Sequence, residues 1–371
     1  MKNRSRYRFL CFLFLLLFVN LAMLLTGCSV KTEKKDVAVE DTSGERLSIG
    51  MSFDSFVIER WIRDRDVFIS TAEDLGAQVN VQNANGNVDE QIEQIEYFIE
   101  KKMDVIVIIA IDGDALGDVV KRAREAGIRV VCYDRLIRNA QTDLYISFDN
   151  VKVGSLMGEA LKKALPDGGN IFAIYGSESD NNVDLVIEGL TSSLEGSGLN
   201  IVYSSYCRNW LAELAFTAVN EGLQEYGSVD GIMCGNDDLA SQAIRALSEH
   251  RLAGKVAVVA QDAELSACQR IVEGTQTMTV YKSVEELARN AAVLAVALAK
   301  HEDITSENCS LQVTQKIDDG TAQIPYFSID PMSVTAENMD DVIIGSGFHR
   351  REDVYLNVAD TPEAAGTEAV E

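Results

Sequence analysis

Residues 128–137, IRVVCYDRLI, begin with a run of mostly apolar, β-branched side chains and then place an acid and a base, Asp134 and Arg135, side by side. Such a run predicts a strand that is buried on both faces, as in a parallel sheet covered by helices. Ligands of open parallel sheets bind beyond the carboxyl ends of the strands, so Asp134 and Arg135 are predicted to face a site. An adjacent acid and base suit a catalyst, an anion site or a neutral polyhydroxyl ligand.

The same alternation of short apolar runs and longer amphipathic segments extends along most of the chain. In the first half it predicts strands at residues 47–53, 77–82, 104–110, 128–134 and 143–150, with helices at residues 57–75, 88–102 and 114–127. The rhythm then restarts, with predicted strands at residues 170–176, 200–206, 229–237 and 255–263 and a helix from Trp210. Repeated strand–helix–strand units predict parallel sheets, and the restart favours two doubly wound α/β lobes over one large sheet.

Composition excludes several classes of function. The chain has 371 residues and a formal net charge of −25, which disfavours nucleic acid as a partner. Beyond residue 28 it has five cysteines at wide spacing without a CxxC pair, and its three histidines are far apart, so neither a disulfide framework nor a zinc site is indicated. Cys132 and Cys234 lie in apolar runs and are expected to be buried. We therefore expect no metal and no cofactor.

The N-terminus carries an export signal. A basic segment, MKNRSRYRF, precedes the apolar LCFLFLLLFVNLAMLL, and LLTGCSV follows, which resembles the lipobox of bacterial lipoproteins. The resemblance implies cleavage of residues 1–27 and lipid attachment to Cys28; a plain membrane anchor with an incidental cysteine is the alternative. The polar residues 28–45 are predicted to form a flexible tether, and residues 354–371 a disordered acidic tail.

Polar side chains follow strand after strand. Arg60 and Trp61 come after the first predicted strand, and later strands end in Asp134 and Arg135, in Asp149 and Asn150, in Asn236 and Asp237, in Asp262 and in Lys282. Any one of these residues could serve only to form a turn or to cap a helix. Their recurrence at the ends of successive strands favours a ligand-binding site.

The residue types suit a sugar better than an ion. Carboxylates accept from sugar hydroxyls while arginine, lysine and asparagine donate to them, and the charges cancel. Trp61 and Trp210 fall in different predicted lobes and are expected to stack on the two faces of a pyranose. Serine-hydrolase elbow, phosphate-loop and dinucleotide motifs are missing; paired carboxylates leave a glycosidase open on residue types alone.

Several motifs carry a specific resemblance to the sugar-binding proteins of bacterial ABC importers, above all the D-xylose-binding branch. The motifs are IGMSFDSFVIERWIRDRDVF, VQNANGNVDEQIEQIE, DVIVII, YDRLI, YISFDNVKVG, GNDD, QDAE and GTQTMTVYK, within residues 47–350. The resemblance implies a type I periplasmic-binding fold: two Rossmann-like lobes joined by a hinge of three crossing segments. The lobes would comprise residues 46–149 with about 283–328, and residues 150–282 with about 329–353.

The resemblance also implies the ligand-binding residues, position by position. They are Arg60, Trp61, Asp134, Arg135, Asp149, Asn182, Trp210, Asn236, Asp262 and Lys282. The segment around Trp210, Ala260 before the QDA motif and the region after Lys300 depart from the family pattern, which bears most on ligand identity. The acidic calcium loop of some relatives has no counterpart.

We expect an extracytoplasmic, lipid-anchored, monomeric receptor on the outer face of the cytoplasmic membrane, with ABC permease subunits as partners and no enzymatic activity. D-xylose is the expected ligand, with glucose, galactose and arabinose as alternatives. A sugar sensor for a membrane histidine kinase or chemoreceptor would use the same outer surface. A LacI-type repressor shares the core fold but would need a basic N-terminal DNA-binding segment where this chain has an export signal.

Overall fold

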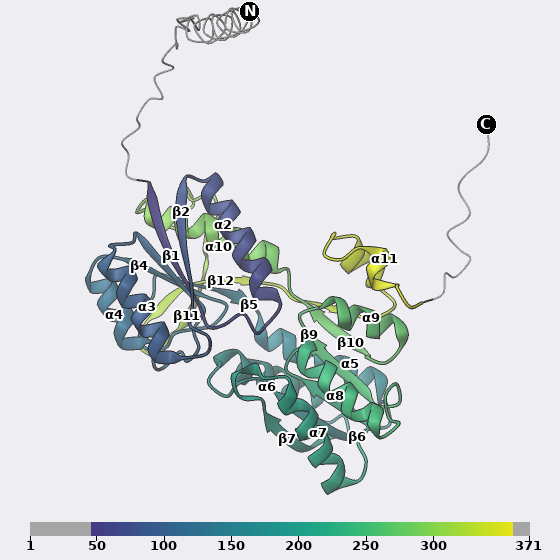
Figure 1. Ribbon diagram of the computed structural model, residues 1–371. Coiled ribbons are helices and arrows are strands. Elements are labelled where there is room, and N and C mark those ends of the chain that lie inside the picture. Colours follow the sequence, from purple (N-terminus) through teal and green to yellow (C-terminus); the bar gives the residue numbers. More distant parts are fainter. Residues whose placement is uncertain (1–45, 359–371) are drawn as a thin grey trace, which may run out of the picture. The chain divides into compact units, whose positions relative to one another are not determined.

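The computed structural model describes residues 46–358 (Figure 1). The predicted signal segment, Cys28 and the tether lie outside the described residues, as does the tail from residue 359. Val354 was predicted to begin the tail, but it ends a short helix and is buried, so the folded chain continues past that boundary. Among residues 46–358, no helix is both long and apolar enough to cross a membrane.

The first sheet has seven strands in the order β11-β12-β5-β4-β3-β1-β2, parallel except for the β11–β12 hairpin. The strands are β1 (Leu47–Phe53), β2 (Ala77–Asn83), β3 (Val105–Ile108), β4 (Arg129–Tyr133), β5 (Leu144–Phe148), β11 (Gln315–Asp318) and β12 (Gln323–Ile329). Its helices are α2 (Arg60–Asp74), α3 (Val88–Glu100), α4 (Gly117–Glu125) and α10 (Val284–Ala299). Every residue of β3 and β5 is buried, which explains why these strands are continuously apolar rather than alternating.

The second sheet has six strands in the order β13-β10-β9-β8-β6-β7, and only β13 is antiparallel to its neighbour. The strands are β6 (Gly169–Tyr175), β7 (Leu199–Tyr206), β8 (Gly231–Cys234), β9 (Ala257–Gln261), β10 (Met278–Tyr281) and β13 (Met332–Val334). The helices that follow in the same half are α5 (Asn150–Ala164), α6 (Asn181–Leu194), α7 (Glu213–Tyr226), α8 (Asp237–Glu249) and α9 (Leu265–Glu273). The last elements of the described residues are a π-helical turn, η2 (Asp340–Ile344), and α11 (Arg351–Val354).

The chain passes between the two sheets three times, after β5, after β10 and after β12. The two doubly wound α/β lobes predicted from the sequence are therefore confirmed as two sheets with their own helices. Cys132 and Cys234 are fully buried, as expected. One predicted helix starts later than expected: Trp210 lies in a 3₁₀ turn, η1 (Arg208–Trp210), and α7 begins at Glu213, because Asn209 and Trp210 have positive φ values of 54° and 57°.

Candidate ligand-binding site

A cavity lies where the carboxyl ends of strands from both sheets meet. The space between its lining atoms, counted together with open solvent, is about 490 Å³. The lining residues are Ile58, Arg60, Trp61, Asp134, Arg135, Asn150, Tyr175, Gly176, Asp180, Asn182, Val183, Val186, Trp210, Met233, Gly235, Gln261, Asp262 and Lys282. Their positions follow β1, β4, β5, β6, β7, β8, β9 and β10, so both sheets contribute.

Arg60 and Trp61 reach the cavity from the first turn of α2. The Arg60 guanidinium lies over the Trp61 ring, 4.4 Å from its centroid. It also makes two buried ion pairs, from Nη2 to Asp64 Oδ1 at 3.1 Å and to Asp134 Oδ2 at 3.0 Å. Burial disfavours the cation, but Asp64, Asp134 and Asp262 outweigh it and raise the pKa of Arg60. Asp64 is itself inaccessible and also accepts from the Tyr133 hydroxyl, so it orients Arg60 from behind the cavity.

Asp134 is held in a left-handed backbone conformation, with φ of 65°. Its carbonyl accepts hydrogen bonds from the hydroxyls of Ser147, at 2.7 Å, and Tyr145, at 3.0 Å. The Asn182 amide donates to both the carbonyl and the carboxylate of Asp134, each at 3.0 Å. Burial works against ionisation of the Asp134 carboxyl, but three cations led by Arg60 outweigh it and lower its pKa. The carboxylate therefore stays charged.

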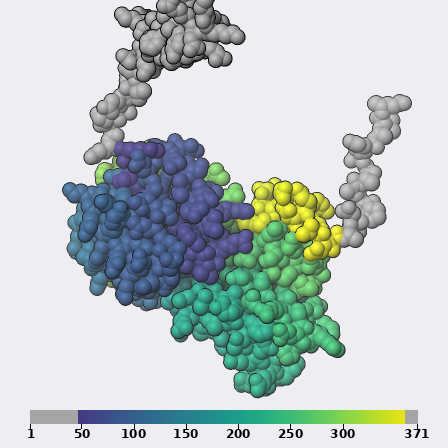
Figure 2. Space-filling model, viewed as in Figure 1, coloured from purple at the N-terminus to yellow at the C-terminus, as the bar shows by residue number. Residues whose placement is uncertain are grey.

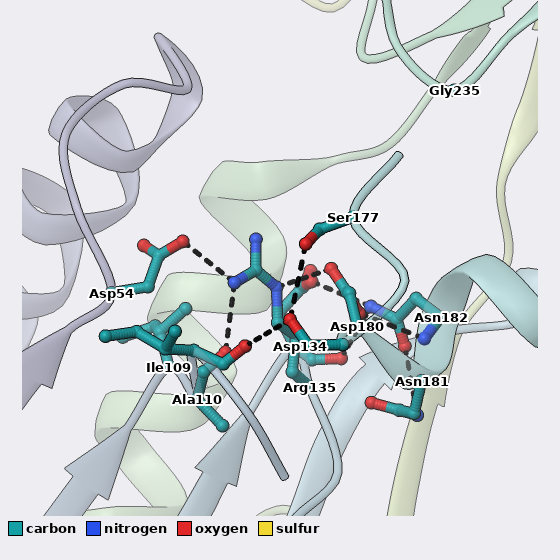
Figure 3. A network of polar contacts seen from close by, with 12 residues as sticks. Asp54, Ile109, Ala110, Asp134, Arg135, Ser177, Asp180, Asn181, Asn182 and Gly235 are labelled. Carbon is teal, nitrogen blue, oxygen red and sulfur yellow. Dashed lines mark hydrogen bonds and ion pairs between the residues drawn. The ribbon is translucent and has the colours of Figure 1, made fainter. Parts of the chain in front are cut away.

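Arg135 ties the two lobes together (Figure 3). Its Nη1 donates to Asp54 Oδ2 at 2.8 Å and to the Ala110 carbonyl at 3.0 Å, both in the first lobe. Its Nε lies 2.6 Å from Asp180 Oδ2, at the start of α6 in the second, as an ion pair whose angle is poor for a hydrogen bond. The sequence predicted that Arg135 grips a ligand hydroxyl. In the structure these contacts go to protein groups, so Arg135 bridges the cleft, and its contact with a ligand stays a prediction.

Trp210 enters the cavity from the second lobe. Two glycines make room for its ring: a Cβ at Gly176 would lie 2.2 Å from the ring, and one at Gly235 would lie 2.7 Å from the Gly176 nitrogen and 3.1 Å from the ring. Such distances are shorter than van der Waals contact, so the ends of β6 and β8 need glycine for Trp210 to pack there. Lys282 and Asp262 complete this side as a buried ion pair, with 2.7 Å between Nζ and Oδ1.

Four buried polar atoms in or next to the cavity have neither a hydrogen-bond partner nor an ion-pair partner among residues 46–358. They are the indole Nε1 of Trp61 and of Trp210, Gln261 Oε1 and Asn236 Nδ2. Buried polar atoms are nearly always hydrogen-bonded, and an orphaned group costs about 1–3 kcal/mol. Orphans gathered at one cavity point to a ligand that carries both donors and acceptors.

The structure brings most of the predicted site residues to the cavity and leaves two outside its lining. Arg60, Trp61, Asp134, Arg135, Asn182, Trp210, Asp262 and Lys282 line it, whereas Asp149 and Asn236 do not. Asp149 caps α5 by accepting from the Lys152 N–H at 2.9 Å, and its neighbour Asn150 faces the cavity instead. Asn236 caps α8 through its Oδ1, which leaves its amide nitrogen as the orphan named above.

Sequence reasoning named Asn150 at a strand end but chose its neighbour Asp149 for the site, and it missed two further polar lining residues, Asp180 and Gln261. The alternation of side chains at a strand end was the signal that could have separated Asn150 from Asp149. Asp180 precedes the predicted Asn182 in a polar loop and caps α6, which hid its pairing with Arg135. Gln261 lines the cavity, donates its amide to the Gly235 carbonyl at 2.5 Å and has an unpaired Oε1. It stands directly before Asp262 in the QDA motif.

A cavity between two α/β lobes that is lined by polar side chains from both defines a solute-binding protein. Nowhere in residues 46–358 do three or more histidine, cysteine, aspartate or glutamate side chains gather in a way that could hold a metal ion. The charged residues of the lining are already paired with one another or with second-layer carboxylates. The site therefore has the arrangement of a polar receptor for a small molecule.

Comparison with known proteins agrees. Residues 49–303 match the periplasmic binding protein domain. The chain is 42% identical to a D-xylose-binding periplasmic protein of Haemophilus influenzae and 39% identical to one of Escherichia coli, over 83% and 84% of this chain and 92% and 93% of theirs. A Clostridium phytofermentans ABC-transporter solute-binding protein with bound β-D-glucose superposes with a TM-score of 0.74 at 26% identity, covering 83% of this chain and 99% of that one.

The chain belongs to the periplasmic binding protein family. The resemblance inferred from the motifs is thus confirmed, and with it the two-lobed fold. The protein is an extracytoplasmic solute-binding protein of the ABC-transport type and not an enzyme.

Proposed function

We propose that the protein binds a single monosaccharide, D-xylose, in the cavity between its lobes and delivers it to an ABC permease. The observation that carries this proposal is a charge-balanced polar cavity flanked by two tryptophans whose indole nitrogens lack partners. The names of the relatives from Haemophilus influenzae and Escherichia coli support xylose over other sugars. The structure bound to β-D-glucose supports a glucose-specific receptor as the alternative.

The balance of charge favours a neutral ligand. The charged side chains of the lining are Arg60, Arg135, Lys282, Asp134, Asp180 and Asp262, three of each sign. Because these groups neutralise one another, the cavity has little net attraction for an ion. Each sugar hydroxyl both donates and accepts, so it can satisfy an indole N–H or the Gln261 oxygen as well as a carboxylate. Hydrogen bonds from sugar hydroxyls to the carboxylates are charge-assisted and are therefore stronger than hydrogen bonds between neutral groups.

Within this proposal, the ten residues predicted from the sequence are joined by Asn150, Asp180 and Gln261. Trp61 and Trp210 stack on the sugar, Asp134, Asp262, Lys282 and Arg60 bond its hydroxyls, and Arg135 holds the lobes over it. Asn236 takes part through its unpaired amide nitrogen, while Asp149 acts only as a helix cap. The lobe boundaries at residues 149/150, 282/283 and 328/329 are the proposed hinge.

The proposal includes an anchor. The lipobox-like LTGCS predicts a lipid on Cys28, and residues 29–45 then tether a monomeric receptor to the outer face of the cytoplasmic membrane. In a cell without an outer membrane this placement would keep the receptor near the permease, because an untethered receptor would diffuse away.

Calorimetric titration of residues 29–371 with xylose, glucose, galactose, arabinose and ribose tests the proposed function. We expect tight one-to-one binding of xylose, and Trp61→Ala should weaken it by about 1–3 kcal/mol because a stacking ring is lost. A different winning sugar would retain the mechanism and change the specificity. If none of the five binds, the proposed function is wrong.

A further inference from the structure

The backbone that presents Asp262 to the cavity is strained. Asp262 and Ala263 follow β9 with φ values of 100° and 53°, both in the region that disfavours side chains with a Cβ. Neither residue is glycine, so neighbouring groups must hold this turn in place. The position of the Asp262 carboxylate, and hence its pair with Lys282, depends on those groups.

Most of the turn is held from within the second lobe. The Asp262 N–H donates to the Val280 carbonyl at 2.9 Å, and the Ala263 N–H donates to Thr279 Oγ1 at 3.1 Å. The Glu264 N–H donates to the buried carboxylate of Asp237 at 3.1 Å. These bonds fix the three N–H groups and leave the Ala263 carbonyl to be fixed from the other side.

His349 supplies the remaining contact from a segment near the C-terminus, with 2.8 Å between its Nε2 and the Ala263 carbonyl oxygen. A carbonyl oxygen only accepts, so Nε2 must carry the proton. The Cys268 thiol also approaches this oxygen, at 3.5 Å, but a thiol is a weak donor. His349 therefore makes the strong hydrogen bond to the strained turn.

The segment that carries His349 is itself anchored to both lobes. The ring of the preceding Phe348 packs on Tyr281 of β10 with centroids 4.9 Å apart. Arg63 of α2 donates to the Phe348 carbonyl at 3.2 Å and places its guanidinium 4.2 Å from the ring centroid. Further along, Gln269 of α9 donates to the Asp353 carbonyl at 2.8 Å, and α11 lies beside α9 (Figure 1).

The placement of this segment is visible on the surface. In Figure 2 the yellow C-terminal residues adjoin the purple residues that follow β1, in agreement with the contact between Arg63 and Phe348. The segment lies beyond residues 49–303, which match the family domain. It reaches the back of the ligand site without lining it, since neither Phe348 nor His349 is among the residues around the cavity.

We propose that His349 is a positioning residue for the ligand site: its Nε2–H holds the Ala263 carbonyl and thereby aims the Asp262 carboxylate at the ligand. This inference rests on the proposed function, because sugar affinity is its main readout. It assigns the C-terminal segment a role in binding and not only in packing against α9.

Two substitutions separate the hydrogen bond from the bulk of the ring. His349→Phe keeps a ring and removes the donor, whereas His349→Gln keeps an N–H donor at nearly the same reach. Loss of one hydrogen bond should weaken xylose binding roughly three- to tenfold for the phenylalanine variant, and glutamine should recover most of the affinity. His250→Phe is the matched control, because His250 is exposed at the end of α8 and bonds only Asn220.

A double-mutant cycle with Asp262→Ala gives the decisive result. Once Asp262 is truncated there is no carboxylate to aim, so His349→Phe should then have no further effect on affinity. An equal loss in both backgrounds would overturn the proposal, as would unchanged affinity of His349→Phe in the otherwise intact protein.

Hydrogen exchange provides a readout that does not depend on the ligand. Amides of residues 262–264 should exchange faster in His349→Phe than in the parent or in His349→Gln, while amides of α3 stay unchanged. If the parent bound no sugar, the proposed function would fail, but this local exchange would still decide whether His349 holds the turn. Unchanged amide exchange at residues 262–264 in His349→Phe would refute the claim that His349 stabilises this turn.

Discussion

Replacing Arg135 by methionine removes the cation that joins the two lobes. Arg135 is 4% exposed and pairs with Asp54 and Asp180, whose side chains are 9% and 3% exposed. Methionine has a comparable length but leaves both carboxylates buried without their cation. Breaking a buried pair by removing one partner costs about 3–5 kcal/mol. At about 2–4 °C per kcal/mol, the melting temperature should fall by about 6–20 °C at pH 7.

The loss should depend on pH in a defined direction. Burial already raises the pKa values of Asp54 and Asp180, while Arg135 lowers them, so removing the arginine raises both further. Carboxyls with raised folded-state pKa values bind protons more readily in the folded than in the unfolded chain, so their contribution to stability falls as pH rises through that window. The deficit of Arg135→Met relative to the parent should therefore be smallest near pH 4–5 and largest at pH 7–8, values set by the usual aspartate pKa of about 4.

Thermal unfolding of parent and variant at pH 5, 6, 7 and 8 measures this deficit. Arg138→Met is the matched control, since Arg138 lies three residues further on and pairs with Asp114 and Asp184. Its side chain is 41% exposed, so its loss should cost below about 1 kcal/mol with little dependence on pH. Equal effects of the two substitutions, or a deficit in Arg135→Met that does not grow with pH, would refute the reasoning.

Three further outcomes are expected. Asp64→Asn should weaken sugar binding about tenfold in calorimetry, because the amide cannot hold the Arg60 guanidinium as the carboxylate does; unchanged affinity would show that Asp134 alone orients it. Gly235→Ala should reduce sugar binding while the protein remains folded by circular dichroism, because the added methyl group collides with the Gly176 backbone and crowds the Trp210 ring that packs on it. Cys28→Ala should release the protein from membranes into the soluble fraction upon cell fractionation, and continued sedimentation with membranes would argue against a lipid anchor.

Helices and strands whose hydrophobic pattern is visible in the sequence could be predicted from it. The apolar runs at β3 and β5 and the helices between strands follow from burial on both faces of a parallel sheet, so the two lobes could be predicted from the sequence. The strand ends also located the site, since Asp134 and Lys282 line the cavity as expected.

The roles of the individual site residues depend on which hydrogen bonds and ion pairs form in the folded chain. The sequence alone does not specify these bonds. Asp149 and Asn150 are adjacent and chemically similar, yet one caps α5 and the other faces the cavity, because Asp149 has the extended backbone of a helix cap and Asn150 begins the helix. Arg135 was expected to bind the ligand, and the structure adds a partner, Asp54, that lies 81 residues away in the sequence. A spacing of that kind has no local pattern, so a ligand contact and a structural bridge cannot be distinguished before the chain is folded.

Three residues that line the cavity have a strained backbone, which explains why residues outside the lining should affect binding. Asp134, Trp210 and Asp262 all have positive φ, at 65°, 57° and 100°. Each such conformation costs about 1–3 kcal/mol and persists only where the surroundings enforce it. For Asp134 the enforcement comes from the hydroxyls and amide that bond its carbonyl, and for Asp262 from the bonds around its turn. Because these groups hold the side chains before a ligand arrives, binding a sugar need not order them, and less affinity is lost to ordering. Loosening any of these supports should therefore weaken binding although no ligand contact has been removed.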